Sequence, residues 1–379
     1  MKPVEVILAH RRAGAFWSIE ELFATVSGAF PPWVKATQAN APHARADLRS
    51  MVGNLRWMRT LGPCDVLHLT GALHYAALGN RRHPLVLTIH DLRFIDEARG
   101  LRRFLFWLWW LYLPCLRATR VTVISEFTKQ RLLAIGRVNP AKLRVIPNCV
   151  APEFVASPKP WPGDPCDTVG RTGLGPPTCP PCGASDPAMT SRPQGAPRTS
   201  EAACPYPLQG KVRVLQVGTT DNKNLARVIQ ACSGLAVRLC ILGRLSESQH
   251  EQLSGHDVEY EVHQDLSKEQ VAALYQSCDL LVFVSTYEGF GMPILEAQAV
   301  GRPVLTSDIS PMREVAGDGA LMVDPLDATA IRSGLARLLE DAALREQLVR
   351  AGFRNVAGYS AQSVAAQYAE LYREVTSTR

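Results

Sequence analysis

The sequence predicts an α/β protein with two doubly wound domains that face a cleft and a proline-rich insert between them. A chain of 379 residues is too long for one ordinary core and suits two domains. Short apolar runs typical of buried strands alternate with helical patterns in both halves. Between residues 157 and 209, which hold 13 of the 27 prolines, apolar periodicity is weak. We therefore assign residues 1–155 to a first domain, 156–210 to a linker or disordered insert, 211–355 to a second domain, and 356–379 to a C-terminal helix that packs back toward the first domain.

The composition, 46% hydrophobic and 20% charged, is that of a soluble globular protein. No run approaches the roughly 18 apolar residues of a spanning helix, and residues 1–15 show a strand pattern in place of a signal peptide. We expect a cytoplasmic protein, either free or bound at the inner face of the membrane. Six cysteines lie in or beside apolar segments, which predicts reduced core thiols. They are Cys64, Cys115, Cys149, Cys232, Cys240 and Cys278.

The net charge of +6 is unevenly distributed along the chain. Residues 1–150 hold 21 Lys and Arg against 9 Asp and Glu, a charge of +12, and the remainder holds 20 against 26, a charge of −6. A basic domain can bind nucleic acid, an anionic membrane surface or an anionic substrate. No nucleic-acid-binding motif accompanies the charge, so the membrane surface and the anionic substrate are the partners we expect.

Polar residues follow the predicted strands of the first domain. These strands cover residues 4–9, 65–69, 85–90, 121–125 and 143–146, and a helix capped by Ser18 with Glu21 follows the first of them. The carboxyl ends of such strands form the ligand-binding edge of an open α/β sheet. There we expect His90 beside Asp91 to face a ligand, whereas His68 is interpreted as a packed or surface residue. Ser125 is interpreted as a helix cap.

Residues 102–117 are rich in aromatic side chains and begin and end with arginine. Their uncharged stretch is too short to cross a bilayer. Two interpretations remain open: a helix buried against the sheet, or a helix whose tryptophans reach a membrane interface while arginines contact lipid phosphates. Those arginines are Arg102, Arg103, Arg117 and Arg120.

The insert contains four cysteines, Cys166, Cys179, Cys182 and Cys204, of which one pair has the spacing of a zinc site. Pro180 and Pro181 lie between that pair and lack the backbone amides that usually bond the thiolates. We interpret the segment as linker and predict no metal site.

In the second domain, strands are predicted at 211–217, 237–242, 279–284, 303–306 and 320–323, with an amphipathic helix at 359–372. Lys223 lies on the loop after the first of these strands, at the sheet edge where Glu288 is expected. A lysine there can neutralise a leaving diphosphate.

The stretch 285–296 carries the most specific chemistry in the chain. Gly289 and Gly291 let the backbone approach a ligand, and the helix that Pro293 begins offers amides to an anion such as phosphate. Glu288 and Glu296 are suited to accept hydrogen bonds from neighbouring hydroxyls. Amides for phosphate beside carboxylates for hydroxyls predict a nucleotide-sugar ligand.

These motifs resemble glycosyltransferase family 4, whose members are retaining, nucleotide-sugar-dependent enzymes of the glycosyltransferase B fold with two Rossmann-like domains. The resemblance is carried by Gly218-Thr219, Lys223-Asn-Leu225, Tyr287-Glu-Gly-Phe-Gly-Met-Pro-Ile-Leu-Glu-Ala297, Gly301-Arg-Pro-Val304 and Glu314-Val-Ala-Gly317. Strand ends of the first half add Thr88-Ile-His-Asp91, Val123-Ile-Ser-Glu126 and Val145-Ile-Pro-Asn148.

The resemblance implies that Glu296 holds the ribose, that Glu288 contacts the donor sugar, that Lys223 binds the diphosphate and that His90 lies beside the reaction centre. The catalytic set is then His90, Glu288 and Lys223. The donor-binding set is Gly218, Thr219, Lys223, Glu288, Gly289, Phe290, Gly291 and Glu296. The acceptor-side set is Arg11, Arg12, Gly14, His74, Asp91 and Ser125. The arginine that many relatives carry near the lysine is replaced here by Thr219 to Asn222. Two alternatives follow: Arg11 or Arg12 supplies the charge from across the cleft, or the donor is bound with low affinity.

The expected activity is retaining, metal-independent transfer of a hexose from a UDP- or GDP-linked donor to a glycan or polyprenyl-linked acceptor in cell-surface polysaccharide synthesis. The nucleotide sugar is a co-substrate, and no cofactor is expected. Two alternatives remain: a sugar-nucleotide epimerase of the same fold, and a non-catalytic nucleotide-sugar binder.

Overall fold

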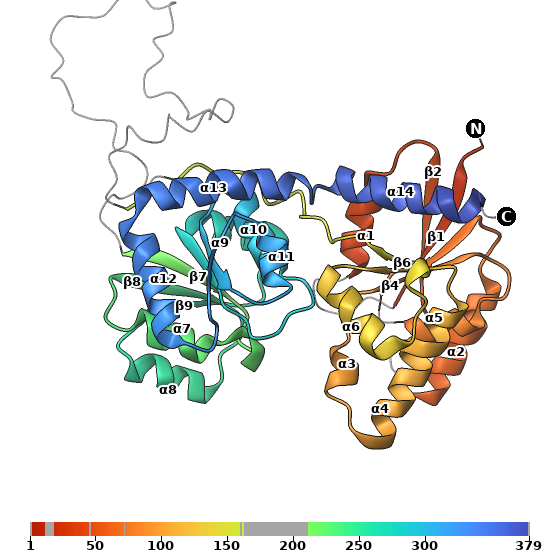
Figure 1. Ribbon diagram of the computed structural model, residues 1–379, viewed down its shortest axis with the longest axis horizontal. Helices are drawn as coiled ribbons and strands as arrows, with labels where there is room; N and C mark the ends of the chain where they lie inside the picture. The colour runs from red at the N-terminus through yellow and green to blue at the C-terminus, as the bar shows by residue number, and fades with distance from the viewer. Residues whose placement is uncertain are drawn as a thin grey trace, which may run out of the picture.

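The computed structural model describes residues 2–11, 19–44, 47–71, 73–159, 161–162 and 211–377. These form two α/β domains side by side, with two long helices running along one edge of both (Figure 1). Each domain contains a six-stranded parallel sheet. The predicted fold class is therefore confirmed. Most of the predicted insert, with its four cysteines, lies outside the described residues, as does Ser18.

The sheet of the first domain has the strand order β2-β1-β3-β4-β5-β6. The strands are β1 (Val4–His10), β2 (Val34–Asn40), β3 (Val66–Leu69), β4 (Leu85–Ile89), β5 (Arg120–Val123) and β6 (Leu143–Val145). Strand β2 was not predicted. It lies at the edge of the sheet and is only partly buried, so its polar sequence VKATQAN shows no apolar run.

Helices cover both faces of this sheet. They are α1 (Ile19–Gly28), α2 (Leu48–Thr60), α3 (Arg93–Asp96), α4 (Gly100–Phe106), α5 (Leu113–Arg117) and α6 (Glu126–Gly136), with 3-10 turns η1 (His74–Gly79) and η3 (Pro140–Lys142) and a π-helical segment η2 (Trp107–Tyr112) between α4 and α5. Side chains that precede two of these helices cap them. Asp47 accepts a hydrogen bond from the Ser50 amide, and Ser125 accepts one from the Thr128 amide.

The second sheet has the order β12-β11-β10-β7-β8-β9, the strand order of dinucleotide-binding folds. Its strands are β7 (Val212–Val217), β8 (Val237–Leu242), β9 (Glu259–His263), β10 (Leu280–Phe283), β11 (Val304–Ser307) and β12 (Leu321–Val323). Strand β9 was also missed, again because an edge strand, here EYEVH, exposes polar side chains.

The second domain contains the helices η5 (Asp221–Lys223), α7 (Leu225–Cys232), α8 (Glu247–Gly255), α9 (Lys268–Ser277), α10 (Met292–Ala299), α11 (Met312–Ala316) and α12 (Ala328–Glu340). Serine or aspartate side chains cap three of them, α8, α9 and α12. Ser246 and Ser267 form capping boxes with Gln249 and Gln270. Trp161, within the range predicted as linker, packs on this domain, where the Arg345 guanidinium lies 3.9 Å from its ring centre.

The C-terminal helices connect the domains. Helix α13 (Ala342–Ala357) lies on the second domain, and α14 (Ala361–Ser377) crosses to the first (Figure 1). Tyr368 and Tyr372 of α14 are buried in one apolar cluster with Val6 and Leu8 of β1. The chain thus ends on the domain in which it begins.

The six cysteines predicted as core thiols form no disulfide in the described residues, and the predicted core position is confirmed for five of them, whereas Cys64 is only partly buried. None of the helices within the described residues is long and apolar enough to cross a membrane.

Candidate active site

The second sheet changes its winding direction between β7 and β10, which are adjacent although two strands separate them in sequence. Ligands of open α/β sheets bind in the crevice at such a point, beyond the carboxyl ends of the strands. The loops 218–224 and 284–291 flank this crevice, and both carry residues predicted from the sequence. The topology therefore brings the Lys223 loop and the Glu288 loop together.

Backbone and amide hydrogen bonds join the two loops. The Thr286 amide donates to the Asn222 carbonyl at 2.8 Å. The buried Asn224 side chain donates to the carbonyls of Val284 and Pro325 at 2.9 and 2.7 Å. Asn224 adopts a left-handed conformation with a φ of 61°, which asparagine tolerates well. Position 224 therefore suits asparagine in both backbone shape and hydrogen bonding.

Lys223 and Glu288 form an ion pair between these loops. The Lys223 Nζ lies 2.6 Å from the Glu288 Oε1, and the side chains are 20% and 15% exposed. The aliphatic part of Lys223 crosses Gly218, where an added Cβ would lie 2.9 Å from the lysine Cγ. The ammonium group also lies 4.7 Å from the ring centre of Phe283. The cation is thus held at the crevice by Glu288 and the Phe283 ring.

Helix α10 begins directly at the crevice. Gly291, with a φ of 111°, precedes it, and Pro293 lies in its first turn. The Glu296 side chain, one turn into the helix, accepts a hydrogen bond from the Tyr275 hydroxyl at 2.6 Å. Burial raises the pKa of Glu296 to about 7 from its ordinary 4.5, although the bond from Tyr275 and the charge of Lys223 act in the opposite direction.

His90 approaches the crevice from the first domain. Its Nε2–H donates to the Thr70 carbonyl at 2.7 Å, which leaves Nδ1 as the acceptor of the neutral ring. Burial lowers the pKa of His90, while the bond to Thr70 and the charge of Asp91 oppose that shift. His90 is therefore neutral near pH 7. Asp91 beside it is exposed and accepts a hydrogen bond from the Arg93 amide.

The glycine loop of the second domain contacts the first domain directly. A Cβ added to Gly289 would lie 3.0 Å from the His90 carbonyl oxygen and 3.1 Å from the Asp91 Cβ. The Gly289 carbonyl accepts a hydrogen bond from the Ser125 hydroxyl at 3.1 Å. Ser125 therefore acts both as the cap of α6 and as an interdomain donor. The absence of a side chain at position 289 permits this contact.

Glu314 of α11 strengthens the same interface. Its two carboxylate oxygens accept hydrogen bonds from the amides of Glu126 and Phe127, at 2.7 and 3.3 Å. These amides belong to the first turn of α6, where a carboxylate is stabilised by the helix dipole. A residue of one domain thus caps a helix of the other, and the two domains are in contact beside the glycine loop.

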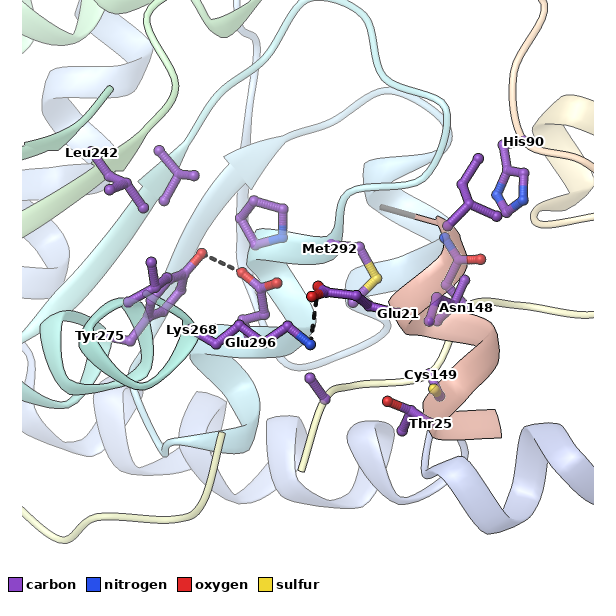
Figure 2. A pocket seen from close by; sticks show the side chains of 16 residues that line it. Glu21, Thr25, His90, Asn148, Cys149, Leu242, Lys268, Tyr275, Met292 and Glu296 are labelled. Carbon is purple, nitrogen blue, oxygen red and sulfur yellow. Dashed lines mark hydrogen bonds and ion pairs between the residues drawn. The ribbon is translucent and has the colours of Figure 1, made fainter. Parts of the chain in front are cut away.

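A cavity of about 390 Å³ lies between α1 of the first domain and α9 and α10 of the second (Figure 2). Tyr275 and Glu296 line one side, and His90 and Asn148 lie toward the other. Its remaining walls are mostly apolar, formed by Ile19, Leu22, Val217, Leu242, Val271, Met292 and other residues. The structure brings His90 and Glu296 to one cavity, whereas Lys223 and Glu288 lie outside its lining.

An ion pair between the two domains lies in the lining of this cavity. The Lys268 Nζ at the start of α9 lies 3.0 Å from Glu21 of α1, and both residues line the cavity (Figure 2). Sequence reasoning singled out neither Lys268 nor Tyr275 as a site residue. Both lie on α9, which precedes the glycine loop but shares no local motif with it.

Several other predicted site residues contact their own domain. Thr219 is partly exposed and donates to the Arg244 carbonyl, and Phe290 is buried against Tyr359. Arg11 pairs with Glu20 at 3.3 Å on the first domain. His74 is buried, is not among the residues that line the cavity and donates to the Trp110 carbonyl, and burial lowers its pKa to about 4. Arg12 and Gly14 lie outside the described residues.

No group of three His, Cys, Asp or Glu side chains within the described ranges is arranged to hold a metal ion. Positive charge at the crevice comes instead from Lys223 and from the amides at the start of α10.

Two facing Rossmann-like domains with a crevice at the switch point of the second define the architecture of a glycosyltransferase B protein. Comparison with known families agrees. "Glycosyltransferase Family 4" matches residues 4–154, and "Glycosyl transferases group 1" matches residues 207–355. The chain belongs to the family 4 glycosyltransferases.

Curated relatives match shorter stretches. The O-antigen chain mannosyltransferase B of Escherichia coli is 35% identical over 105 residues, covering 28% of this chain and 28% of that protein. The phosphatidyl-myo-inositol mannosyltransferase of Mycobacterium leprae is 32% identical over 184 residues, covering 46% and 49%. The chain therefore matches no more than about half the length of these two relatives.

Solved structures match nearly the whole chain. Anabaena HepE, in complex with UDP and glucose, has a TM-score of 0.68 at 13% identity and covers 97% of this chain and 99% of its own. The sucrose-phosphate synthase of Thermosynechococcus elongatus has a TM-score of 0.68 at 14% identity, with coverage of 99% and 100%. At such identities the likeness establishes the fold alone.

Proposed function

We propose that the protein is a retaining glycosyltransferase that moves a hexose from a nucleoside diphosphate sugar to a glycan or lipid-linked glycan of the cell surface. The observation that carries this proposal is the Lys223–Glu288 ion pair at the switch point, on the loop that contacts His90. A cation beside helix amides is suited to a diphosphate, and carboxylates beside it are suited to sugar hydroxyls.

The donor is proposed to lie along the edge of the second domain. Glu296 would accept hydrogen bonds from the ribose within the cavity, and the amides at the start of α10 would bind the diphosphate. Binding would draw Lys223 from Glu288 to the phosphates and leave the Glu288 carboxylate for hydroxyls of the sugar. HepE was solved in complex with UDP and glucose, and the two curated relatives are named mannosyltransferases, which supports testing UDP- and GDP-linked hexoses, mannose included.

The reaction is proposed to occur on one face of the sugar. The bond between the anomeric carbon and the phosphate oxygen breaks, and its electron pair goes to the diphosphate. The acceptor oxygen bonds to the anomeric carbon on the same face and gives its proton to the departing phosphate oxygen. Lys223 and the α10 amides stabilise the charge on the leaving group, so this proposal requires no metal ion.

His90 is proposed to position the sugar. Its Nε2–H is committed to Thr70, so the neutral ring offers Nδ1 as an acceptor for a sugar hydroxyl. Contact between Gly289 and His90 would exclude water from this side of the reaction centre and limit hydrolysis of the donor.

The test is to incubate the purified protein with a panel of UDP- and GDP-hexoses and glycan or polyprenyl-linked acceptors. We expect acceptor-dependent release of one nucleoside diphosphate and a product whose anomeric configuration, determined by NMR, equals that of the donor. An inverted product would overturn the retaining mechanism. Conversion of the donor to an epimer without acceptor would identify an epimerase, and tight donor binding without turnover in any combination would identify a binder.

A further inference from the structure

The aromatic segment that begins at α4 is buried on one side only. Phe106 packs against Phe94, and Trp110 packs against Tyr75, with ring centres 6.1 and 4.9 Å apart. Leu111 is fully buried. The interpretation of residues 102–117 as a helix buried against its own domain therefore holds for one side of the segment and not for the other.

The opposite side of the segment carries large apolar side chains in solvent. Leu101 is 73% exposed, Phe104 52%, Leu105 44% and Trp109 40%. Their spacing of three, four and eight residues from Leu101 places them on one face of the helix. These four residues, named here the α4 stripe, are covered by no part of the chain that the structure describes. Helix α4 projects from the first domain on the side away from α14 (Figure 1).

Arginines surround the α4 stripe. Residues 98–118 contain four arginines and no acidic residue. Arg99, Arg102 and Arg103 are exposed, and none of them forms an ion pair with another described residue. Arg102 lies over the Phe106 ring, with 5.2 Å between its guanidinium carbon and the ring centre. An exposed apolar patch of this kind marks an interaction surface, and cations at its border favour an anionic partner.

Charge complementarity selects the surface. An anionic bilayer offers phosphates for the arginines and an apolar region a few ångströms deeper for leucine and aromatic side chains. Tryptophan and phenylalanine are suited to that boundary. We propose that the α4 stripe docks the protein peripherally on an anionic lipid bilayer, with Arg99, Arg102 and Arg103 at the level of the lipid phosphates.

The docking surface is linked to the reaction centre. Helix α3, which ends four residues before α4, carries Asp96, whose carboxylate accepts a hydrogen bond from the Tyr287 hydroxyl at 3.2 Å. Tyr287 precedes Glu288, and α3 itself begins two residues after Asp91. A bilayer under α4 would therefore present a lipid-linked acceptor to the cleft. This step rests on the proposed transfer reaction, whereas docking itself does not.

Docking is tested by sedimentation of the full chain with vesicles of phosphatidylcholine alone or mixed with phosphatidylglycerol. We expect partition into the anionic vesicles only, decreasing with added salt. The double variant Arg102→Gln/Arg103→Gln should lower the partition constant about thirtyfold, because each basic residue near an anionic surface contributes about 1 kcal/mol. The matched control is the double variant Arg81→Gln/Arg82→Gln. These two adjacent, exposed arginines precede the amino end of β4, whereas His90 follows its carboxyl end.

The apolar part of the stripe is tested separately. Phe104→Ser/Trp109→Ser should lower binding at least about tenfold while the protein still unfolds in one cooperative thermal transition, because both side chains are about half exposed. The control variant Leu326→Ser changes an exposed leucine of the second domain and should bind as the unchanged protein does. In the unchanged protein the tryptophan emission should shift to the blue on adding anionic vesicles, and Trp109→Phe should remove most of that shift.

Three outcomes would overturn the proposal. They are equal binding to neutral vesicles, no binding at low salt, and normal binding by the Phe104→Ser/Trp109→Ser variant. Concentration-dependent dimerisation that this variant abolishes, without vesicle binding, would assign the stripe to a second copy of the chain. Since sedimentation requires no turnover, it separates failure of docking from failure of the proposed transferase activity, which a soluble acceptor measures independently.

Discussion

The Tyr372 hydroxyl lies 2.7 Å from Nδ1 of His68, although the two residues are 304 positions apart. The other ring nitrogen of His68 lies 2.7 Å from the Thr88 hydroxyl, which in turn lies 2.6 Å from that of Thr122. All four side chains are fully buried. This network joins α14 to three strands of the first sheet, so the end of the chain is attached to the core of the domain where the chain begins.

Substituting Tyr372→Phe should lower the free energy of unfolding by about 1–3 kcal/mol, because it leaves one buried nitrogen of His68 without a partner. Urea unfolding followed by circular dichroism measures the change. Tyr260→Phe is the matched control, since it removes a Tyr–His hydrogen bond with His250 at the surface and should cost less than about 0.5 kcal/mol. Equal effects of the two substitutions would show that the buried network does not anchor α14.

Lys223→Gln should lower kcat about 10²- to 10³-fold, because the leaving diphosphate loses its cation in the transition state. Steady-state kinetics with the donor found in the screen measures this. Lys211→Gln removes an exposed ion pair with Glu259 in the same domain and should leave kcat unchanged. An increase in KM with unchanged kcat would instead assign Lys223 to ground-state binding.

The raised pKa of Glu296 predicts a pH dependence of stability. Between the ordinary value of 4.5 and the folded value of about 7, the folded protein binds more protons than the unfolded chain. The free energy of unfolding should therefore decrease as pH rises through this window, and then level off. Glu296→Gln should remove this decrease, which urea unfolding between pH 4 and about 8 would reveal. Parallel curves for the variant and the unchanged protein would exclude Glu296 as its source.

The Tyr275 hydroxyl lowers the pKa of Glu296, so its removal should raise that pKa further. In Tyr275→Phe, the pH above which nucleotide binds tightly should move upward, because the ionised carboxylate is the better acceptor for two ribose hydroxyls. Calorimetric titration with nucleoside diphosphate at several pH values measures the shift. In Glu296→Gln the affinity should be weaker and independent of pH over the same range.

Glu314→Ala should favour separation of the domains, because the amides at the start of α6 lose the carboxylate that caps them from the other domain. A cap of this kind contributes about 1 kcal/mol, which corresponds to a roughly fivefold shift toward open forms. Small-angle X-ray scattering should show a larger radius of gyration. Asp308→Ala, which removes an exposed ion pair with Arg313 within the second domain, should leave the radius unchanged.

Much of the fold follows from local patterns. Apolar runs of four to seven residues marked the buried strands, because a strand covered on both faces is apolar at most of its positions. The edge strands β2 and β9 were not predicted, because the side chains that they expose to solvent are polar. The position of Lys223 and Glu288 at one sheet edge was predicted, since parallel strands deliver the loops that follow them to the same edge, whereas their ion pair was not.

The sequence by itself determined the alternation of strand and helix, the glycine loop with its two carboxylates, and the position of Lys223 at the same sheet edge. Each of these depends on residues that lie close together along the chain. Only the tertiary structure decided the Tyr372–His68 bond, the Glu21–Lys268 pair in the lining of the cavity, and the exposed side of the α4 stripe. These depend on which distant segments pack together and which face of a helix is left uncovered, and no local periodicity encodes either.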